Sequence, residues 1–285
     1  MTNVKCLRCN TINFVADEAC RVCGVELKGL LPYSETPAGA DNRDPTAETI
    51  ASIPSFEGVG DVLGPTLNLF IKNLWLITKI VFVVVAPFEI FKAMSLPRLQ
   101  SDWQLAVGLF FLQLFCGVLI APALVYALMR VLETGEAPGI AESYRWGAGK
   151  LGKLILCAAL TWCWETLGTL LLIIPGIIIA LNLVLVYPVA ILENRSVSEA
   201  LQRSRDLTRG RRLRILGAGI LMFLPVMVLT IAISFVLPEN GPVWQLNVLH
   251  DILSDILEQS GTVFCLVLYL SILRRTLERG RSVIK

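Results

Sequence analysis

Four cysteines near the N-terminus have the spacing of a metal site. Cys6 and Cys9 form one C-x-x-C pair, and Cys20 and Cys23 form a second pair ten residues further along the chain. Four thiolates can enclose a zinc ion tetrahedrally, and two C-x-x-C turns are the usual way to supply them. Two disulfides or a redox pair are the alternatives. A closed four-cysteine site leaves no position for water, so the pattern predicts a structural zinc ribbon over residues 1–28.

The rest of the chain is strongly apolar. Of its 285 residues 55% are hydrophobic and 17% are charged, and the mean hydropathy is +0.67. An ordinary soluble domain is about 25% charged. Residues 103–129 contain only two strongly polar side chains, Gln104 and Gln113. A run of 18 or more apolar residues is a candidate transmembrane helix, so the sequence predicts an all-α integral membrane protein.

Composition divides the chain into three domains. Residues 29–55 hold four prolines and many small polar residues, which predicts a disordered linker after the zinc ribbon. Residues 56–285 form the membrane domain. Amphipathic patterns predict interfacial helices at 56–70, 139–150 and 196–210, the first broken at Gly64-Pro65 and the last opened by a capping box of Ser196 and Glu199. Six spans are predicted, with a tight turn at Pro175-Gly176, over about 71–94, 104–129, 152–173, 177–192, 215–237 and 253–273.

The distribution of basic residues predicts the orientation in the membrane. Residues 193–214 carry seven arginines, whereas the turn after the third span and the loop after the fifth contain no lysine or arginine. Under the positive-inside rule both termini then lie in the cytoplasm of a bacterium, and the protein is a multi-pass inner-membrane protein. We expect no signal peptide, because residues 1–10 lack an apolar core. The net charge of +2 is too small to indicate nucleic-acid binding.

Ionisable and amide side chains within the predicted spans are candidates for a site. Glu165 lies near the middle of the third span, where a carboxyl group is costly and by default a functional candidate. Its expected partner is Lys79 in the first span. A purely structural ion pair, a protonated Glu165, or a Lys79 that reaches the membrane surface are the alternatives. Asn182 is expected to form an interhelical hydrogen bond. His250 falls in the predicted outer loop, and no role is assigned to it.

A cluster of arginines follows the fourth predicted span. Beside the lipid bilayer itself, anionic lipid headgroups are possible partners, since each basic side chain near the surface contributes about 1 kcal/mol to such binding. The alternative is that these charges set the topology and bind nothing. The cluster consists of Arg203, Arg205, Arg209, Arg211, Arg212 and Arg214.

Residues 174–216 resemble part of the six-span membrane domain attached to some bacterial glycerophosphodiester phosphodiesterases, and its free-standing relatives. The matching residues are Pro175-Gly176, Pro188, Glu193, Glu199-Ala200-Leu201, Arg203-Ser204, Leu207-Thr208 and Gly210. The resemblance extends loosely over residues 56–280 and implies a six-span fold. The catalytic domain of those enzymes is a separate soluble barrel, and no stretch here can hold it, so their activity is not implied. Residues 1–28 resemble the short zinc-ribbon modules of many bacterial membrane proteins.

These observations predict a non-enzymatic membrane protein. No phosphate-binding loop, nucleophile–base pair or carboxylate dyad is recognisable. The first hypothesis is an adaptor or membrane-organising protein whose cytoplasmic zinc ribbon, with structural Zn²⁺, recruits a cytoplasmic protein. The alternative is a small transporter or lipid-handling protein that uses Glu165 and Lys79 within the membrane.

Overall fold

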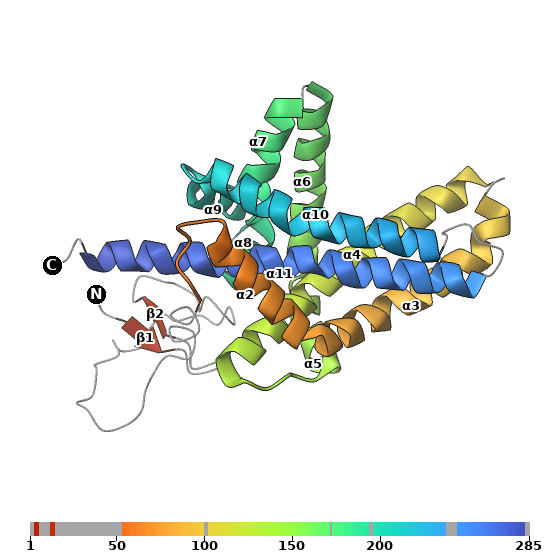
Figure 1. The fold of residues 1–285 in the computed structure, drawn as a ribbon, viewed down its shortest axis with the longest axis horizontal. Helices are drawn as coiled ribbons and strands as arrows, with labels where there is room; N and C mark the ends of the chain where they lie inside the picture. The colour runs from red at the N-terminus through yellow and green to blue at the C-terminus, as the bar shows by residue number, and fades with distance from the viewer. Residues whose placement is uncertain are drawn as a thin grey trace.

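The described part of the chain is almost entirely helical (Figure 1). The computed structural model describes residues 3–5, 12–14, 53–99, 102–171, 173–193, 196–237 and 244–282. Side chains are not described for residues 3–5, 12–14, 96–99, 162, 165, 167–171, 173–174 and 277–282.

Two short strands represent the N-terminal domain. β1 (Asn3–Lys5) pairs with β2 (Ile12–Phe14) in antiparallel register. In the sequence these strands flank Cys6 and Cys9. All four N-terminal cysteines, and the predicted linker up to residue 52, lie outside the described residues. The zinc ribbon therefore stays a prediction.

Four long helices lie along one another and form the body of the molecule. They are α3 (Leu74–Leu99), α4 (Trp103–Thr134), α10 (Arg212–Val236) and α11 (Trp244–Ser282). Figure 1 shows that the end of α3, the start of α4, the end of α10 and the start of α11 all lie at one end of this four-helix body. α11 packs against α3, α4 and α10, and α3 also packs against α4.

The four-helix body exposes a large apolar surface. Phe111 of α4 is 62% exposed, and Phe235 of α10 is 85% exposed. In the most apolar 18-residue stretch of α10, only 6% is buried. Within the described residues, five segments are long and apolar enough to cross a bilayer: Leu74–Ser95, Trp103–Thr134, Pro175–Leu192, Arg212–Val236 and Trp244–Thr276. Such a surface belongs in lipid, and the chain is a multi-pass membrane protein whose described residues after 52 form helices and short connections.

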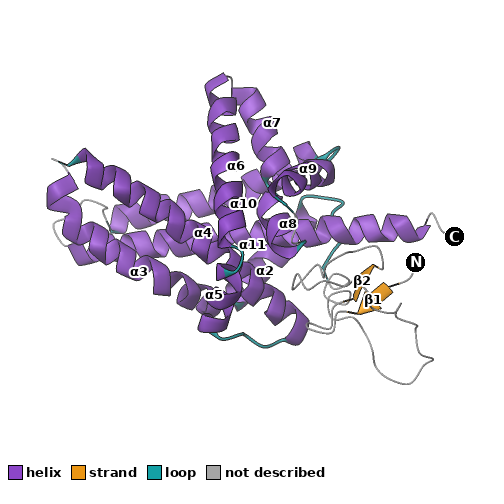
Figure 2. Ribbon diagram, turned by 180° about the vertical axis from the view of Figure 1, so that it is seen from behind, coloured by secondary structure: helices purple, strands orange, loops and turns teal. Residues whose placement is uncertain are grey.

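A helical hairpin projects from the four-helix body. α6 (Leu151–Leu171) and α7 (Ile173–Leu183) lie side by side and rise away from α10 and α11 (Figure 2). α6 corresponds to the third predicted span. Within the described residues, its apolar segment Leu151–Thr161 is shorter than the 18 residues of a candidate span. The number of six spans therefore stays a prediction.

The prediction of a turn at Pro175-Gly176 is wrong. α6 ends at Leu171 and α7 begins at Ile173, so both predicted turn residues lie in the first turn of α7. Proline is tolerated there because the first N–H groups of a helix have no intrahelical acceptor. The next predicted span is not continuous either, since α7 ends at Leu183 and α8 (Val186–Leu192) begins after two intervening residues.

Two other predicted boundaries are also wrong. α2 (Gly60–Lys72) passes through Gly64 and Pro65 without a break. α11 begins at Trp244, nine residues before the predicted start of the last span, so His250 lies in a helix and not in a loop. With 39 residues α11 is about 58 Å long, roughly twice the thickness of the hydrocarbon core.

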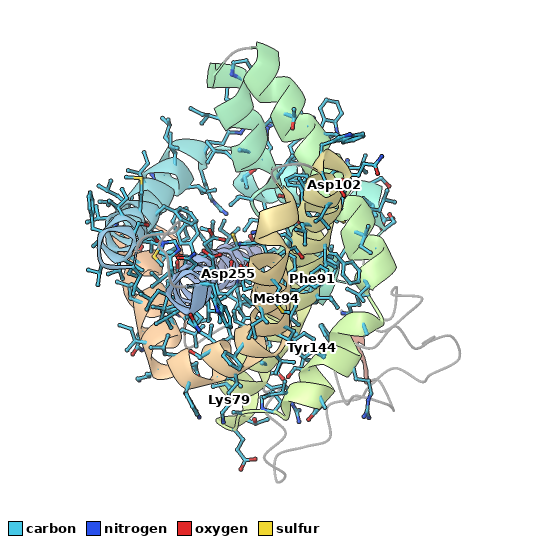
Figure 3. The ribbon with its side chains drawn as sticks, turned by 90° about the vertical axis from the view of Figure 1, so that its right-hand side faces the viewer. Lys79, Phe91, Met94, Asp102, Tyr144 and Asp255 are labelled. Carbon is cyan, nitrogen blue, oxygen red and sulfur yellow. The ribbon has the colours of Figure 1, made fainter. Side chains whose placement is uncertain are left out.

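Two shorter helices occur where the sequence predicts interfacial helices. α5 (Ile140–Ala148) packs against α4, and the hydroxyl of Tyr144 donates a hydrogen bond of 2.5 Å to the carbonyl of Ile80 on α3. Figure 3 shows Tyr144 between α5 and α3. Burial raises the pKa of Tyr144, so the hydroxyl stays a donor. α9 (Val197–Thr208) begins with the predicted capping box, in which Glu199 accepts from the N–H of Ser196 at 3.0 Å.

Candidate functional site: a polar cluster and an apolar cavity

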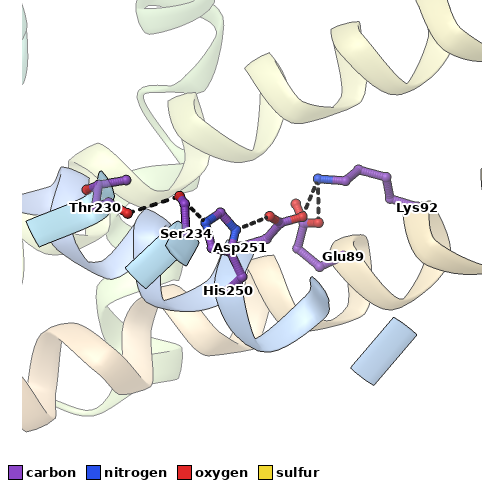
Figure 4. Close-up of polar contacts among 6 residues, drawn as sticks. All are labelled: Glu89, Lys92, Thr230, Ser234, His250 and Asp251. Atoms are coloured by element: carbon purple, nitrogen blue, oxygen red, sulfur yellow. Dashed lines mark hydrogen bonds and ion pairs between the residues drawn. The ribbon is translucent and has the colours of Figure 1, made fainter. Parts of the chain in front are cut away.

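A cluster of polar side chains lies near the end of the four-helix body. Its members, named here the polar cluster, are Glu89 and Lys92 of α3, Ser234 of α10, and His250 and Asp251 of α11 (Figure 4). Ionisable groups within membrane helices are rare and by default mark functional sites. The cluster is also the point at which three separate helices meet through charged contacts.

Lys92 is held between two carboxylates from different helices. Its ammonium nitrogen lies 2.6 Å from Oε2 of Glu89 and donates a hydrogen bond of 2.7 Å to Oδ2 of Asp251. The Glu89 side chain is only 2% exposed, and that of Asp251 is 16% exposed. In so buried a position a carboxylate needs a cation or a proton. Lys92 therefore joins α3 to α11.

His250 extends the contacts of Asp251 to α10. Its Nδ1 lies 3.0 Å from Oδ1 of Asp251, and its Nε2 lies 2.9 Å from Oγ of Ser234. The Ser234 hydroxyl also lies within hydrogen-bond distance of the carbonyl of Thr230, at 3.0 Å. Its one hydrogen goes either to this carbonyl or to Nε2, so both contacts of His250 form with a neutral ring as well as with an imidazolium. His250 therefore links Asp251 of α11 to Ser234 of α10 in either form.

The polar cluster brings two carboxyl groups, one lysine and one histidine into contact. Glu89 and Asp251 both contact Lys92, and Asp251 also contacts His250. A proton gained or lost by any of these groups changes the balance of charge where α3 meets α11.

A polar stripe on α11 leads away from the polar cluster. Asp255 lies one turn beyond Asp251 within the body, as Figure 3 shows. Gln259 donates to the carbonyl of Asp255 at 3.4 Å and accepts from the hydroxyl of Thr262 at 3.1 Å. The stripe therefore reaches Thr262, about 16 Å along the helix from Asp251.

Thr262 lines an apolar cavity between α4, α8 and α11. The cavity has a volume of about 260 Å³ and is partly open. Three of the residues that line the cavity are small: Gly117, Ala121 and Gly261. The complete lining is Gly117, Val118, Ala121, Val125, Tyr187, Pro188, Ile191, Gly261, Thr262, Cys265 and Leu266.

α8 borders this cavity just beyond the break in its span. The hydroxyl of Ser204, which is fully buried in α9, donates to the carbonyl of Asn182 at 2.6 Å and accepts from the N–H of Leu185 at 3.3 Å. These backbone groups lie on the two sides of the break. One serine side chain therefore replaces the helical hydrogen bonds that the break removes.

A second contact fixes the other end of α8. Glu193, its C-cap, accepts a hydrogen bond from Nε of Arg203 at 3.3 Å and another from the hydroxyl of Tyr269 at 3.1 Å. This contact joins α8, α9 and α11. Arg203 is thus engaged in the fold. Of the other arginines in the predicted headgroup cluster, Arg205, Arg209 and Arg214 are exposed, and Arg211 and Arg212 are half-buried. Their binding to anionic lipid stays a prediction.

The intramembrane residues singled out from the sequence lie apart from the polar cluster. Lys79 is exposed, and its ammonium nitrogen lies 4.9 Å from the centre of the Trp75 ring. The side chain of Glu165 lies outside the described residues, so its pairing with Lys79 stays a prediction. The backbone carbonyl of Asn182 accepts the hydrogen bond from Ser204, and the buried Oδ1 of its side chain has no hydrogen-bond partner among the described residues.

Sequence reasoning missed most of the polar cluster. Glu89 was recognisable as a charge inside a predicted span. Two sequence patterns could have indicated the rest. Glu89 and Lys92 are three residues apart, which places them on one face of a helix. The spacing of Asp251, Asp255 and Glu258 likewise places three carboxyl groups on one face of a helix. The prediction of a loop around His250 concealed the second pattern. Within the described residues, no group of three or more His, Cys, Asp or Glu side chains could hold a metal ion.

Lys150 should make the stability of the folded protein depend on pH. It precedes α6, donates to the carbonyl of Ile191 and lies 3.7 Å from the centre of the Trp146 ring. Burial, and secondly the charge of Lys153, lower the pKa of Lys150 from 10.5 to about 8. The unfolded chain therefore binds more protons between these two values, and the folded state gains stability as pH rises from 8 toward 10.5.

Thermal unfolding in detergent at pH 7.5 and at pH 9.5 checks this prediction. We expect the Tm difference between the two pH values to be more positive for the wild type than for Lys150→Met, which lacks the titrating group. Equal Tm differences in the two proteins would contradict it.

Comparison with known protein families finds a match for the larger part of this chain. The sequence model of one family, described as Domain of unknown function (DUF7847), matches residues 104–272, which is more than half of the chain. The chain belongs to this family. The DUF7847 region runs from α4 into α11 and includes the cavity, Ser204, His250 and Asp251. Glu89 and Lys92 precede it. No curated protein and no solved structure matches the chain.

Proposed function

We propose that this DUF7847 protein is a multi-pass membrane transporter that binds a proton at the polar cluster during its cycle. The observation that carries the proposal is the contact of four ionisable side chains between α3 and α11, in which Lys92 lies between Glu89 and Asp251 and His250 lies beside Asp251. Histidine is the side chain that most readily changes charge near neutral pH. It is therefore suited to bind and release a proton in a working cycle.

Proton binding at His250 would act on the packing of three helices. His250 contacts Ser234 of α10, and Asp251, which His250 also contacts, holds Lys92 of α3. A proton bound by the ring would add a positive charge beside Asp251, and this charge would compete with Lys92 for the same carboxylate. A change in the charge of one ring is thus linked to contacts between α3, α10 and α11, as a proton-driven conformational change requires.

The broken span beside the cavity supports the same proposal. Many transporters bind substrate where membrane helices are discontinuous and free backbone groups line a cavity. Here α8, which begins just after the break, lines a cavity, and the polar stripe of α11 runs from Asp255 to Thr262 in the cavity wall. The proposal keeps the transporter hypothesis drawn from the sequence, but it rests on the polar cluster in place of Glu165 and Lys79.

Proton entry into sealed vesicles tests the proposed function. The full-length protein is reconstituted into liposomes that contain a pH-sensitive dye, and a potassium gradient with valinomycin makes the interior negative. We expect the wild type to acidify the interior faster than protein-free vesicles do, and Glu89→Gln and Asp251→Asn to lower that rate to the protein-free value. Glu136→Gln, an exposed loop carboxylate, is the control and should leave the rate unchanged.

Size-exclusion profiles of all variants establish that they are folded before rates are compared. Wild-type vesicles that acidify no faster than protein-free vesicles would contradict the proposal. So would Glu89→Gln and Asp251→Asn variants that both acidify at the wild-type rate.

A second role, recruitment of a cytoplasmic protein, is supported by the cysteine pattern. Four cysteines in two C-x-x-C pairs favour a zinc ribbon, and the antiparallel pairing of the strands that flank Cys6 and Cys9 in sequence is compatible with it. We propose that this ribbon lies in the bacterial cytoplasm together with the C-terminus, that the membrane domain has six spans, and that the protein is not an enzyme.

Native mass spectrometry in a mild detergent should detect one zinc ion per chain. Cys6→Ser with Cys9→Ser should lose the zinc ion together with any bound cytoplasmic protein, because the fold of a zinc ribbon depends on its metal. A wild-type protein without zinc would contradict the ribbon. A partner that stays bound to the cysteine variant would contradict recruitment through it.

A further inference from the structure

We propose that the cavity between α4, α8 and α11 binds one acyl chain of a phospholipid from the surrounding bilayer. This inference goes beyond the proposed function, because occupation of the cavity does not require proton binding at the polar cluster. The two sites are also separate in space. Asp251 and Gly261 are ten residues apart on α11, which corresponds to about 15 Å.

The lining selects an apolar occupant. No charged side chain is among its residues. The hydroxyl of Thr262 is already committed to Gln259, and the other polar atoms belong to the single side chains Tyr187 and Cys265. A buried water needs two to four polar partners, so these walls hold ordered water poorly. Ions and polar solutes would find no compensation for their lost hydration.

The size of the cavity fits an acyl chain and excludes an α-helix. An apolar cavity of about 150 Å³ stays free of water and accepts benzene-sized molecules. The volume here, about 260 Å³, is larger and is confined between three helices. An α-helix with its side chains is about 10 Å in diameter and cannot enter. The occupant is therefore flexible, apolar and narrow.

The surroundings of the cavity determine which apolar molecule reaches it. All three walls come from candidate membrane spans, and the cavity is partly open. Beside Gly117 on α4, the large side chains of Leu114 and Phe115 are more than 40% exposed and face the bilayer environment. Phospholipid chains are the most abundant molecules there. An open apolar cavity at this position is filled by such a chain at no cost in headgroup dehydration.

Gly117 and Gly108 provide a matched pair of variants. Both lie on α4 at exposed positions, and a Cβ added at either would meet no atom within 4 Å. Only Gly117 lines the cavity. Replacement of a helical glycine removes an unfavourable residue, so Gly117→Phe and Gly108→Phe should both fold. Gly117→Phe places its ring in the cavity, whereas Gly108→Phe places it elsewhere on the surface of α4.

Photo-crosslinking in vesicles tests the inference. The full-length protein is reconstituted into phosphatidylethanolamine and phosphatidylglycerol vesicles with a small fraction of phosphatidylcholine whose acyl chain carries a diazirine. After illumination, mass spectrometry maps the labelled peptides. We expect strong labelling of residues 187–191 and 261–266 in the wild type and in Gly108→Phe. Gly117→Phe should lower it about tenfold, equivalent to about 1.4 kcal/mol of binding free energy.

Two results would overturn the inference. The first is labelling of residues 187–191 and 261–266 that is the same in Gly117→Phe as in the wild type, which would mean that bulk lipid labels these segments from outside. The second is loss of wild-type labelling when unlabelled free fatty acid is added at a concentration that leaves the vesicles intact. In that case the occupant is a free fatty acid and not a phospholipid chain.

Discussion

Replacement of Lys92 by methionine should destabilise the folded protein by about 3–5 kcal/mol, because the change leaves a buried charge without its partner. Lys92 lies within 2.7 Å of carboxylate oxygens of both Glu89 and Asp251, and the Glu89 side chain is 2% exposed. Methionine keeps the length and apolar contacts of the lysine stem but lacks the ammonium group. Thermal unfolding in detergent, followed by tryptophan fluorescence, measures the loss.

A second substitution in the same cluster separates charge from packing. Glu89→Gln in the Lys92→Met background removes the carboxylate that was left without a cation, and we expect it to restore a large part of the lost stability. Lys79→Met on the same helix is the control, since Lys79 is exposed and contacts only the Trp75 ring among the described residues. Equal losses for Lys92→Met and Lys79→Met would show that the polar cluster does not stabilise the fold.

Ser204→Ala should cost roughly 2–4 kcal/mol, because the variant leaves two buried backbone groups without a partner. The Ser204 hydroxyl joins the carbonyl of Asn182 to the N–H of Leu185 across the break between α7 and α8. Alanine is nearly the same size, so the loss reports the hydrogen bonds and not a cavity. Denaturation in detergent at fixed pH measures the difference from the wild type.

Ser198→Ala is the matched control for this prediction. Ser198 lies on the same helix, is exposed, and its hydroxyl lies 3.4 Å from that of Ser196. We expect its effect to stay below about 0.5 kcal/mol, as for most surface substitutions. A Ser204→Ala variant as stable as Ser198→Ala would mean that other groups form hydrogen bonds with the carbonyl of Asn182 and the N–H of Leu185.

The two predictions concern the two structural features on which the proposals depend. The polar cluster joins α3, α10 and α11 at one end of the four-helix body, and Ser204 maintains the break beside the cavity. Several residues of the 174–216 segment that were singled out from the sequence belong to α8 or hold its two ends in place. Pro188 lines the cavity, Ser204 spans the break, and Glu193 binds Arg203 just beyond α8.

The sequence by itself determined the class of the protein and the places of most helices. Long apolar runs must leave water, so the spans that became α3, α4, α10 and α11 were recognisable from composition and length. Local capping chemistry was equally readable. Ser196 and Glu199 form the predicted capping box, and Gly210, the last residue of the predicted helix 196–210, has a positive φ of 76°. These features depend on neighbours within a few residues.

Only the tertiary structure decided the polar cluster, the cavity and the broken span. Lys92 and Asp251 are 159 residues apart in the chain, and no local pattern records that they meet. Pro65 and Pro175 were read as breaks, yet both lie inside helices, while the real break after Leu183 depends on Ser204 from another helix. Charged and broken segments in a membrane are stable only with partners, and the packing of distant helices supplies those partners.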